Sequence, residues 1–65
     1  MNHENEFYDT PFFTLQMCVS CEHPQIEELK KLCIWSVAHE EGNWLFEFHS
    51  ASEYDLLLLG FKRHS

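Results

Sequence analysis

Two segments in which apolar and polar side chains alternate constrain the fold of this chain more than any other feature. The first is FFTLQMCV at residues 12–19, and the second is WLFEF at residues 44–48. Because successive side chains of a strand point to opposite faces, both segments are predicted to be half-buried strands. Their apolar faces carry Phe13, Leu15, Met17, Val19, Trp44, Phe46 and Phe48. Their other faces carry Thr14, Gln16, Cys18, Leu45, Glu47 and His49.

Two further segments have the spacing of amphipathic helices. The apolar side of PQIEELKKLC, residues 24–33, carries Ile26, Leu29, Leu32 and Cys33. The second segment is ASEYDLLLL at residues 51–59. At its start, Ser50 and Glu53 match a capping box, in which each side chain satisfies a free backbone donor of the other residue. Gly60 follows at the position of a left-handed cap. Helices are therefore predicted over both segments.

A short β-rich segment at residues 34–39 follows the first predicted helix, and a turn at residues 40–43 connects it to WLFEF. A strand-helix-strand crossover followed by a hairpin favours a sheet with the third strand between the first two. We expect an α+β fold, a small ferredoxin-like β-α-β-β-α domain with a three-stranded antiparallel sheet and two helices on one face. Residues 1–11 are expected to be an acidic N-terminal arm and residues 12–65 a single domain. A vestigial fourth strand at Lys62–Ser65 is an alternative that the sequence does not decide.

Length and charge narrow the classes of partner. The chain has 65 residues, enough for one small domain, and 11 acidic against four basic residues give a net charge of −7. This charge disfavours direct binding to nucleic acid or anionic membranes and favours a protein partner with a basic surface. No apolar stretch approaches the roughly 20 residues of a membrane span, and the N-terminal segment has no signal-peptide pattern. The three cysteines, an odd number, argue against a disulfide framework, so a reducing, cytoplasmic setting is expected.

The stretch MCVSCEH at residues 17–23 raises the question of a metal site. Cys18, Cys21, Cys33 and His39 have the spacing C-x2-C-x11-C-x5-H, and their ligand types suit tetrahedral zinc. A strand, C-x-x-C and a helix also begin a thioredoxin-like redox unit, but the chain is too short for that sheet. The structural alternative is that Cys18 faces outward from a strand, Cys21 lies in a turn and Cys33 lies in the core. We take the structural alternative as the working prediction, with no metal and no cofactor.

The same motif, placed between the first strand and the first helix of a small α+β chain, resembles the heavy-metal-associated domain of copper chaperones and transport ATPases. The resemblance covers residues 13–63 in element order. It implies that Cys18 and Cys21 bind a soft monovalent ion through two thiolates, and that Gly60-Phe61 matches the glycine-aromatic pair that often closes the second helix. The family pattern is Met-x-Cys-x-x-Cys, whereas Met17 here directly precedes Cys18. A soft-metal carrier for copper or zinc is therefore the alternative function.

The acidic residues that helix dipoles do not explain lie among aromatic residues. Aromatic anchors inside a charged rim are typical of protein interfaces. We therefore expect a small acidic protein-binding module, an inhibitor or regulator that blocks a basic surface of its partner, for example one that otherwise binds nucleic acid. Phage-encoded anti-host and anti-defence proteins are often similar in size and charge, and a homodimer is also left open. The predicted partner-binding residues are Glu4, Glu6, Phe7, Tyr8, Asp9, Glu40, Glu41 and Glu47.

No catalytic motif accompanies these residues. The five histidines are scattered, and the sequence contains no phosphate-binding loop and no paired-carboxylate pattern. A two-layer domain of this size also has little room for a substrate pocket. The chain is therefore predicted not to be an enzyme.

Overall fold

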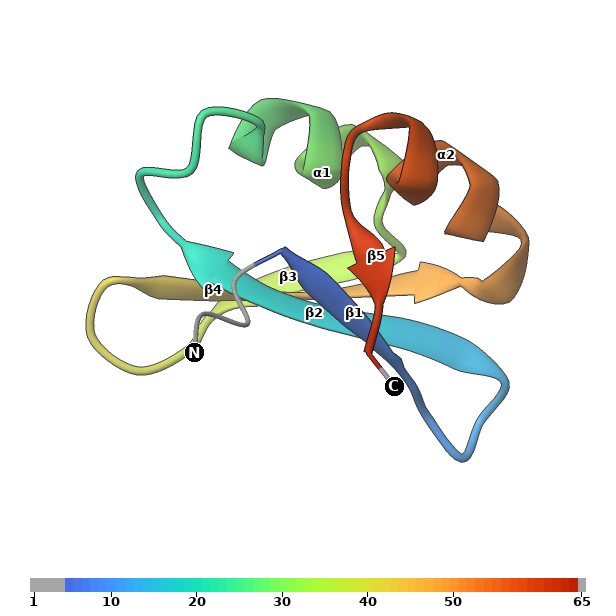
Figure 1. Ribbon diagram of the computed structural model, residues 1–65. Coiled ribbons are helices and arrows are strands. Elements are labelled where there is room, and N and C mark those ends of the chain that lie inside the picture. The colour runs from blue at the N-terminus through green and yellow to red at the C-terminus, as the bar shows by residue number, and fades with distance from the viewer. Residues whose placement is uncertain (1–4, 65) are drawn as a thin grey trace.

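A computed structural model describes residues 5–64 of the chain, and Figure 1 shows its ribbon. The elements follow in the order β1 (Glu6–Asp9), β2 (Thr14–Ser20), α1 (Ile26–Leu32), β3 (Trp35–Ala38), β4 (Asn43–His49), α2 (Glu53–Leu58) and β5 (Lys62–Arg63). A 3-10 turn at Ser50–Ser52 leads into α2. Within this described part, no helix is long and apolar enough to cross a membrane.

The sheet has five strands in the order β3-β4-β2-β1-β5. Neighbouring strands are antiparallel, except that β1 and β5 are parallel. Both helices lie on one side of the sheet, and no helix formed by residues 5–64 covers the other side, which we call the outer face (Figure 1). The predicted α+β class with two helices is confirmed. The predicted three-stranded ferredoxin-like arrangement is not confirmed, because β1 and β5 extend the sheet and make it mixed.

The acidic N-terminal segment contributes a strand to this sheet. Residues 1–4, including Glu4, lie outside the described residues, but Glu6–Asp9 form β1 and pair with β2. Phe7 points from β1 into the core and is fully buried. From Asn5 onward, the predicted arm is therefore paired with the sheet.

The core lies between the helices and the inner face of the sheet. Alternation predicted the inner faces of both long strands correctly, except at one position. Phe13 was expected inside but is 88% exposed, because the chain turns at residues 11–13 before β2 begins at Thr14. The buried side chains are Phe7, Leu15, Met17, Val19, Leu29, Phe46, Phe48, Leu56 and Phe61.

The two ends of α2 differ in how well the sequence predicted them. At the C-terminal end, Gly60 has a φ of 99°, and its N–H donates to the carbonyl oxygen of Leu57 at 3.0 Å. The N–H of Phe61 donates to the carbonyl oxygen of Leu56 at 3.0 Å, which completes a Schellman motif and turns Phe61 back to the core. At the other end the predicted capping box is absent, since the preceding 3-10 turn replaces it and α2 has no side-chain cap hydrogen bond.

Candidate functional site

The register of the strands identifies the side chains on the outer face. Residues of β2 and β4 alternate between the core and the outer face, and the pairing with β1 and β3 extends this assignment to those strands. Trp35 and Val37 of β3 are 40% and 48% exposed. The side chains on this face include Glu6, Tyr8, Thr14, Gln16, Cys18, Trp35, Val37, Leu45, Glu47, His49 and Lys62.

A single carboxylate lies at the middle of this face. Glu47 pairs with Gln16 on β2 and with Trp35 on β3. Thr14 Oγ1 donates to Glu47 Oε2 at 2.8 Å, and Gln16 Nε2 donates to Glu47 Oε1 at 3.3 Å. Both oxygens of the carboxylate are therefore held by neighbours on β2, which fixes its position while it stays half-buried.

Aromatic side chains flank Glu47 on both sides. Trp35 is opposite Glu47 on one side, and on the other side Gln16 pairs with Tyr8 of β1. The ring of Tyr8 lies 4.5 Å from the ring of His64, centroid to centroid, and His64 Nδ1 is 3.1 Å from Glu6 Oε1. The sheet thus presents a row that runs from Trp35 through Glu47 and Gln16 to Tyr8.

The turn between β1 and β2 forms a second exposed feature, which we call the hairpin tip, residues 11–13. Phe12 is 78% exposed, and Phe13 holds a φ of 62°, in the left-handed region that bulky residues rarely adopt. Thr10 closes the turn: its N–H donates to the carbonyl oxygen of Thr14 at 2.9 Å, and its Oγ1 accepts from the N–H of Phe12 at 3.1 Å. Thr10 Oγ1 is also 2.6 Å from Thr14 Oγ1. Because Thr14 also binds Glu47, the tip adjoins the central carboxylate.

Five predicted partner-binding residues remain accessible on the outer face or in the turn that follows β3. Glu6, Tyr8 and Glu47 alternate with buried neighbours and therefore lie on the outer face. Glu40 and Glu41 are exposed in the β3–β4 turn, where His39 Nε2 is 3.4 Å from Glu40 Oε1.

The other predicted partner-binding residues are placed differently. Phe7 is fully buried, so its ring is not available to a partner. Asp9 is exposed at the end of β1 and is bound by Arg63, which also binds Glu53 on α2. Two hydrogen bonds, to Glu53 and then to Asp9, raise the pKa of Arg63 and keep its guanidinium charged. Glu4 lies outside the described residues.

The sequence did not single out four exposed apolar residues on or beside the outer face, namely Trp35, Val37, Phe12 and Phe13. A signal was present for β3, because the register of the hairpin puts Trp35 and Val37 on the same face as Glu47. No comparable signal existed for the tip. Phe12 and Phe13 continue the apolar pattern of β2, so the sequence predicts a strand at these residues and not a turn.

The segment MCVSCEH is the end of β2 and the start of the loop to α1. Cys18 is half-buried on the outer face, Cys21 is exposed in the loop, and Cys33 packs at the edge of the core, as in the structural alternative. Burial, and then the charge of Glu40, raises the pKa of the Cys18 thiol, which disfavours the thiolate form that binds soft metals. Among residues 5–64, no group of three or more His, Cys, Asp or Glu residues could hold a metal ion.

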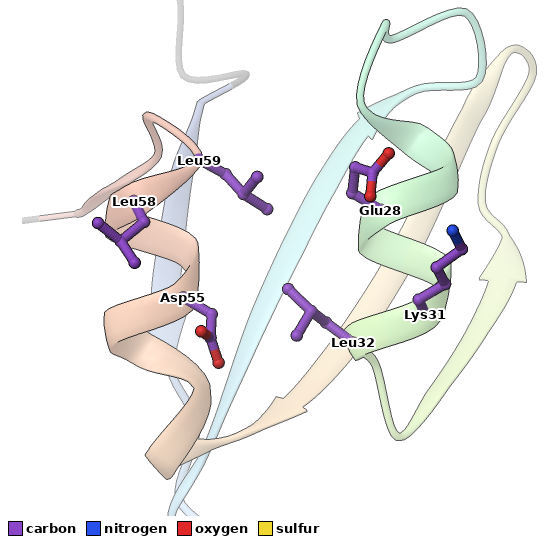
Figure 2. Close-up of a pocket in the computed structure, with 6 residues that line it drawn as sticks. All are labelled: Glu28, Lys31, Leu32, Asp55, Leu58 and Leu59. Carbon is purple, nitrogen blue, oxygen red and sulfur yellow. The ribbon is translucent and has the colours of Figure 1, made fainter.

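A groove of about 340 Å³ lies between α1 and α2, on the side of the molecule away from the outer face (Figure 2). Leu32 and Leu59 point into it from opposite sides. The lining residues include no histidine, cysteine or serine that could act as a nucleophile or as its base. They are Glu28, Lys31, Leu32, Asp55, Leu58 and Leu59.

Comparisons with known proteins give no relative for this arrangement: no protein-family model, no curated protein and no solved structure matches the chain.

Proposed function

We propose that this chain is a small acidic protein-binding module that inhibits or regulates its partner by covering a basic, nucleic-acid-binding surface. In this proposal it acts in the cytoplasm, without catalysis and without a cofactor, as a phage-encoded anti-host or anti-defence protein does. The observation that carries the proposal is the row on the outer face, in which exposed aromatic rings flank a fixed carboxylate. For the fold, we propose a ferredoxin-like unit from β2 to α2, extended by β1 and β5, which the strand order β3-β4-β2 supports.

The charge distribution supports a basic partner. Three adjacent strands of the sheet, β3, β4 and β2, contain no lysine and no arginine. Glu47 lies in their midst, and Glu40 and Glu41 extend the negative charge beyond one end of β3. Because Thr14 and Gln16 already hold the Glu47 carboxylate, a partner that binds it does not have to order it first, which reduces the entropic cost of binding.

Exposed aromatic residues supply the apolar anchors. Truncation of an anchoring aromatic side chain in an interface typically costs more than about 1 kcal/mol of binding free energy. Trp35 is available on the outer face, and Phe12 and Phe13 are available at the hairpin tip beside Glu47. The proposal therefore assigns shape recognition to these rings and orientation to the carboxylates.

The first experiment identifies the partner and tests the charge argument. The tagged chain is used to capture proteins from a host lysate, and the captured protein is identified, purified and titrated with the chain at low and at high salt. Affinity is expected to fall as salt rises, because screening weakens attraction between exposed charges. Added duplex DNA or RNA is expected to compete with the chain. A salt-independent affinity that nucleic acid does not affect contradicts the proposed mechanism.

Variants then test the surface with matched controls. Trp35→Ala is expected to weaken binding at least about fivefold, equivalent to roughly 1 kcal/mol. Tyr54→Ala removes an aromatic ring that is 70% exposed on α2, and is expected to leave binding unchanged. Equal losses in both variants are incompatible with a binding site on the outer face.

Phe13→Gly provides a variant in which binding and folding respond differently. Glycine adopts positive φ without strain, so this substitution is expected to preserve folding stability while it removes an anchor from the tip. Phe13→Ala is the control, because it removes the same ring but keeps the strained backbone. Both are expected to weaken binding, and the glycine variant is expected to be the more stable of the two by about 1 kcal/mol.

A further inference from the structure

The free edge of β3 is unusually apolar. Among the described residues, β3 pairs with β4 alone and ends the sheet on that side. Ile34, Trp35 and Val37 are all substantially exposed along this edge, with exposed fractions of 40 to 48%. The strand and the residue before it contain no charged side chain and no proline. Natural sheets usually protect an edge with such residues, because an open edge can pair with another strand.

The opposite edge of the sheet is protected in that way. Strand β5 has only two residues, Lys62 and Arg63, and both are charged. Arg63 is further tied to Asp9 on β1 and to Glu53 on α2. The two edges of one sheet therefore differ, and only the β3 edge is suited to accept another strand.

The hydrogen-bond pattern shows which backbone groups β3 directs outward. The N–H of His39 donates to the carbonyl oxygen of Asn43 at 3.0 Å, which closes the hairpin between β3 and β4. Bonded and non-bonded pairs alternate along an antiparallel ladder, so Val37 and Trp35 bond to β4. Ser36 and Ala38 therefore direct their N–H and C=O groups away from β4, toward the free edge.

We propose that β3 pairs antiparallel with β3 of a second copy of this chain, around a two-fold axis at Val37. In this register Ser36 of each copy bonds to Ala38 of the other, and each of these pairs exchanges two backbone hydrogen bonds. Val37 lies directly opposite Val37 of the second copy. These two residues form a non-hydrogen-bonded pair, the kind of pair in which side chains approach most closely. Trp35 lies opposite His39 of the second copy. Strand β3 of the second copy thus forms hydrogen bonds with the outward backbone groups and also covers the exposed apolar side chains.

The charges at the two ends of β3 are complementary in this arrangement. Glu40 and Glu41 follow the C-terminal end of β3. Lys30 and Lys31 lie in the last turn of α1, shortly before β3 begins. An antiparallel pair places the end of each strand beside the start of the other. The acidic turn after β3 of one copy therefore lies on the side where α1 of the second copy ends, toward those lysines. An isologous dimer uses each of these contacts twice.

Sedimentation equilibrium of the whole chain tests the dimer, and it does not depend on the proposed function. The expected mass is twice the 7.8 kDa of one chain. Val37→Lys places two like charges opposite each other at the axis and is expected to raise the dimer dissociation constant at least about tenfold. Leu58→Lys adds the same charge at an exposed site on α2 and is the matched control, expected to stay dimeric.

Amide hydrogen exchange gives a second readout that does not require a variant. The outward amides of Ser36 and Ala38 are expected to be protected by the second copy, because among residues 5–64 no other strand pairs with this edge of β3. A monomer at every concentration, rapid exchange at both amides, or a dimer that Val37→Lys leaves intact overturns the proposal. If Val37→Lys fails to fold by circular dichroism, the mass and the exchange rates of the native chain decide the question.

Discussion

Phe7→Ala tests whether β1 is an integral part of this domain. Phe7 has no exposed surface, and its ring lies in the same core cluster as Leu15, Phe48 and Phe61. Truncation of a buried phenylalanine to alanine typically costs about 3–5 kcal/mol, because apolar contacts are lost and a cavity is left. A chain of 65 residues has a total folding free energy of about 3–10 kcal/mol. The substitution is therefore expected to remove a large part of the stability of the domain.

Thermal and urea unfolding followed by circular dichroism measure this effect. For a domain of this size, each kcal/mol shifts the Tm by roughly 4–8 °C, so Phe7→Ala is expected to lower it by at least about 12 °C. The adjacent Tyr8→Ala is the control, since Tyr8 is on the exposed outer face, and its effect is expected to be much smaller. A Tm for Phe7→Ala within a few degrees of the parent refutes the argument, because residues 6–9 then contribute little to the core.

Three further predictions concern the backbone and the cysteines. Gly60→Ala is expected to cost about 1 kcal/mol in urea unfolding, because φ is 99° there, whereas Leu58→Ala at an exposed site is expected to cost less. The raised pKa of Cys18 means that the unfolded chain releases this thiol proton first as pH rises above 9.0. The free energy of unfolding is therefore expected to decrease in alkaline solution, and Cys18→Ala is expected to reduce this dependence. Finally, Cys18→Ser with Cys21→Ser is expected to leave copper and zinc binding unchanged in metal titrations; a stoichiometric site lost in that variant restores the soft-metal hypothesis.

Alternation and cap residues made much of this fold predictable from the sequence. A polar-apolar period of two over residues 14–20 and 43–49 fixes which side chains are buried, because a shift of one residue would expose them all. Gly60 marks the end of α2 because few other residues adopt its conformation. The order β3-β4-β2 follows from the strand-helix-strand crossover through α1 and the short turn between β3 and β4.

The rest depended on contacts between segments far apart in the sequence. Nothing local distinguishes residues 6–9 from an acidic arm, because β1 acquires its partners from β2 and from β5 at the other end of the chain. Phe7 appeared to be an exposed anchor for the same reason. For Phe13 the error was the opposite one: the residue was predicted to be buried and is exposed. The hydrogen bonds of Thr10 form a turn there, although the apolar pattern predicts a strand. Trp35 became part of the candidate surface only through its register with Glu47.

Chemical-shift mapping of the isotope-labelled chain with its purified partner tests the central claim most directly. The outer face is expected to carry the interaction, so the backbone amides of Gln16, Trp35 and Glu47 are predicted to shift on addition of the partner. The amides of α2, residues Glu53–Leu58, are predicted to stay unchanged. Shifts confined to α1 and α2, with the three outer-face amides unaffected, contradict the account.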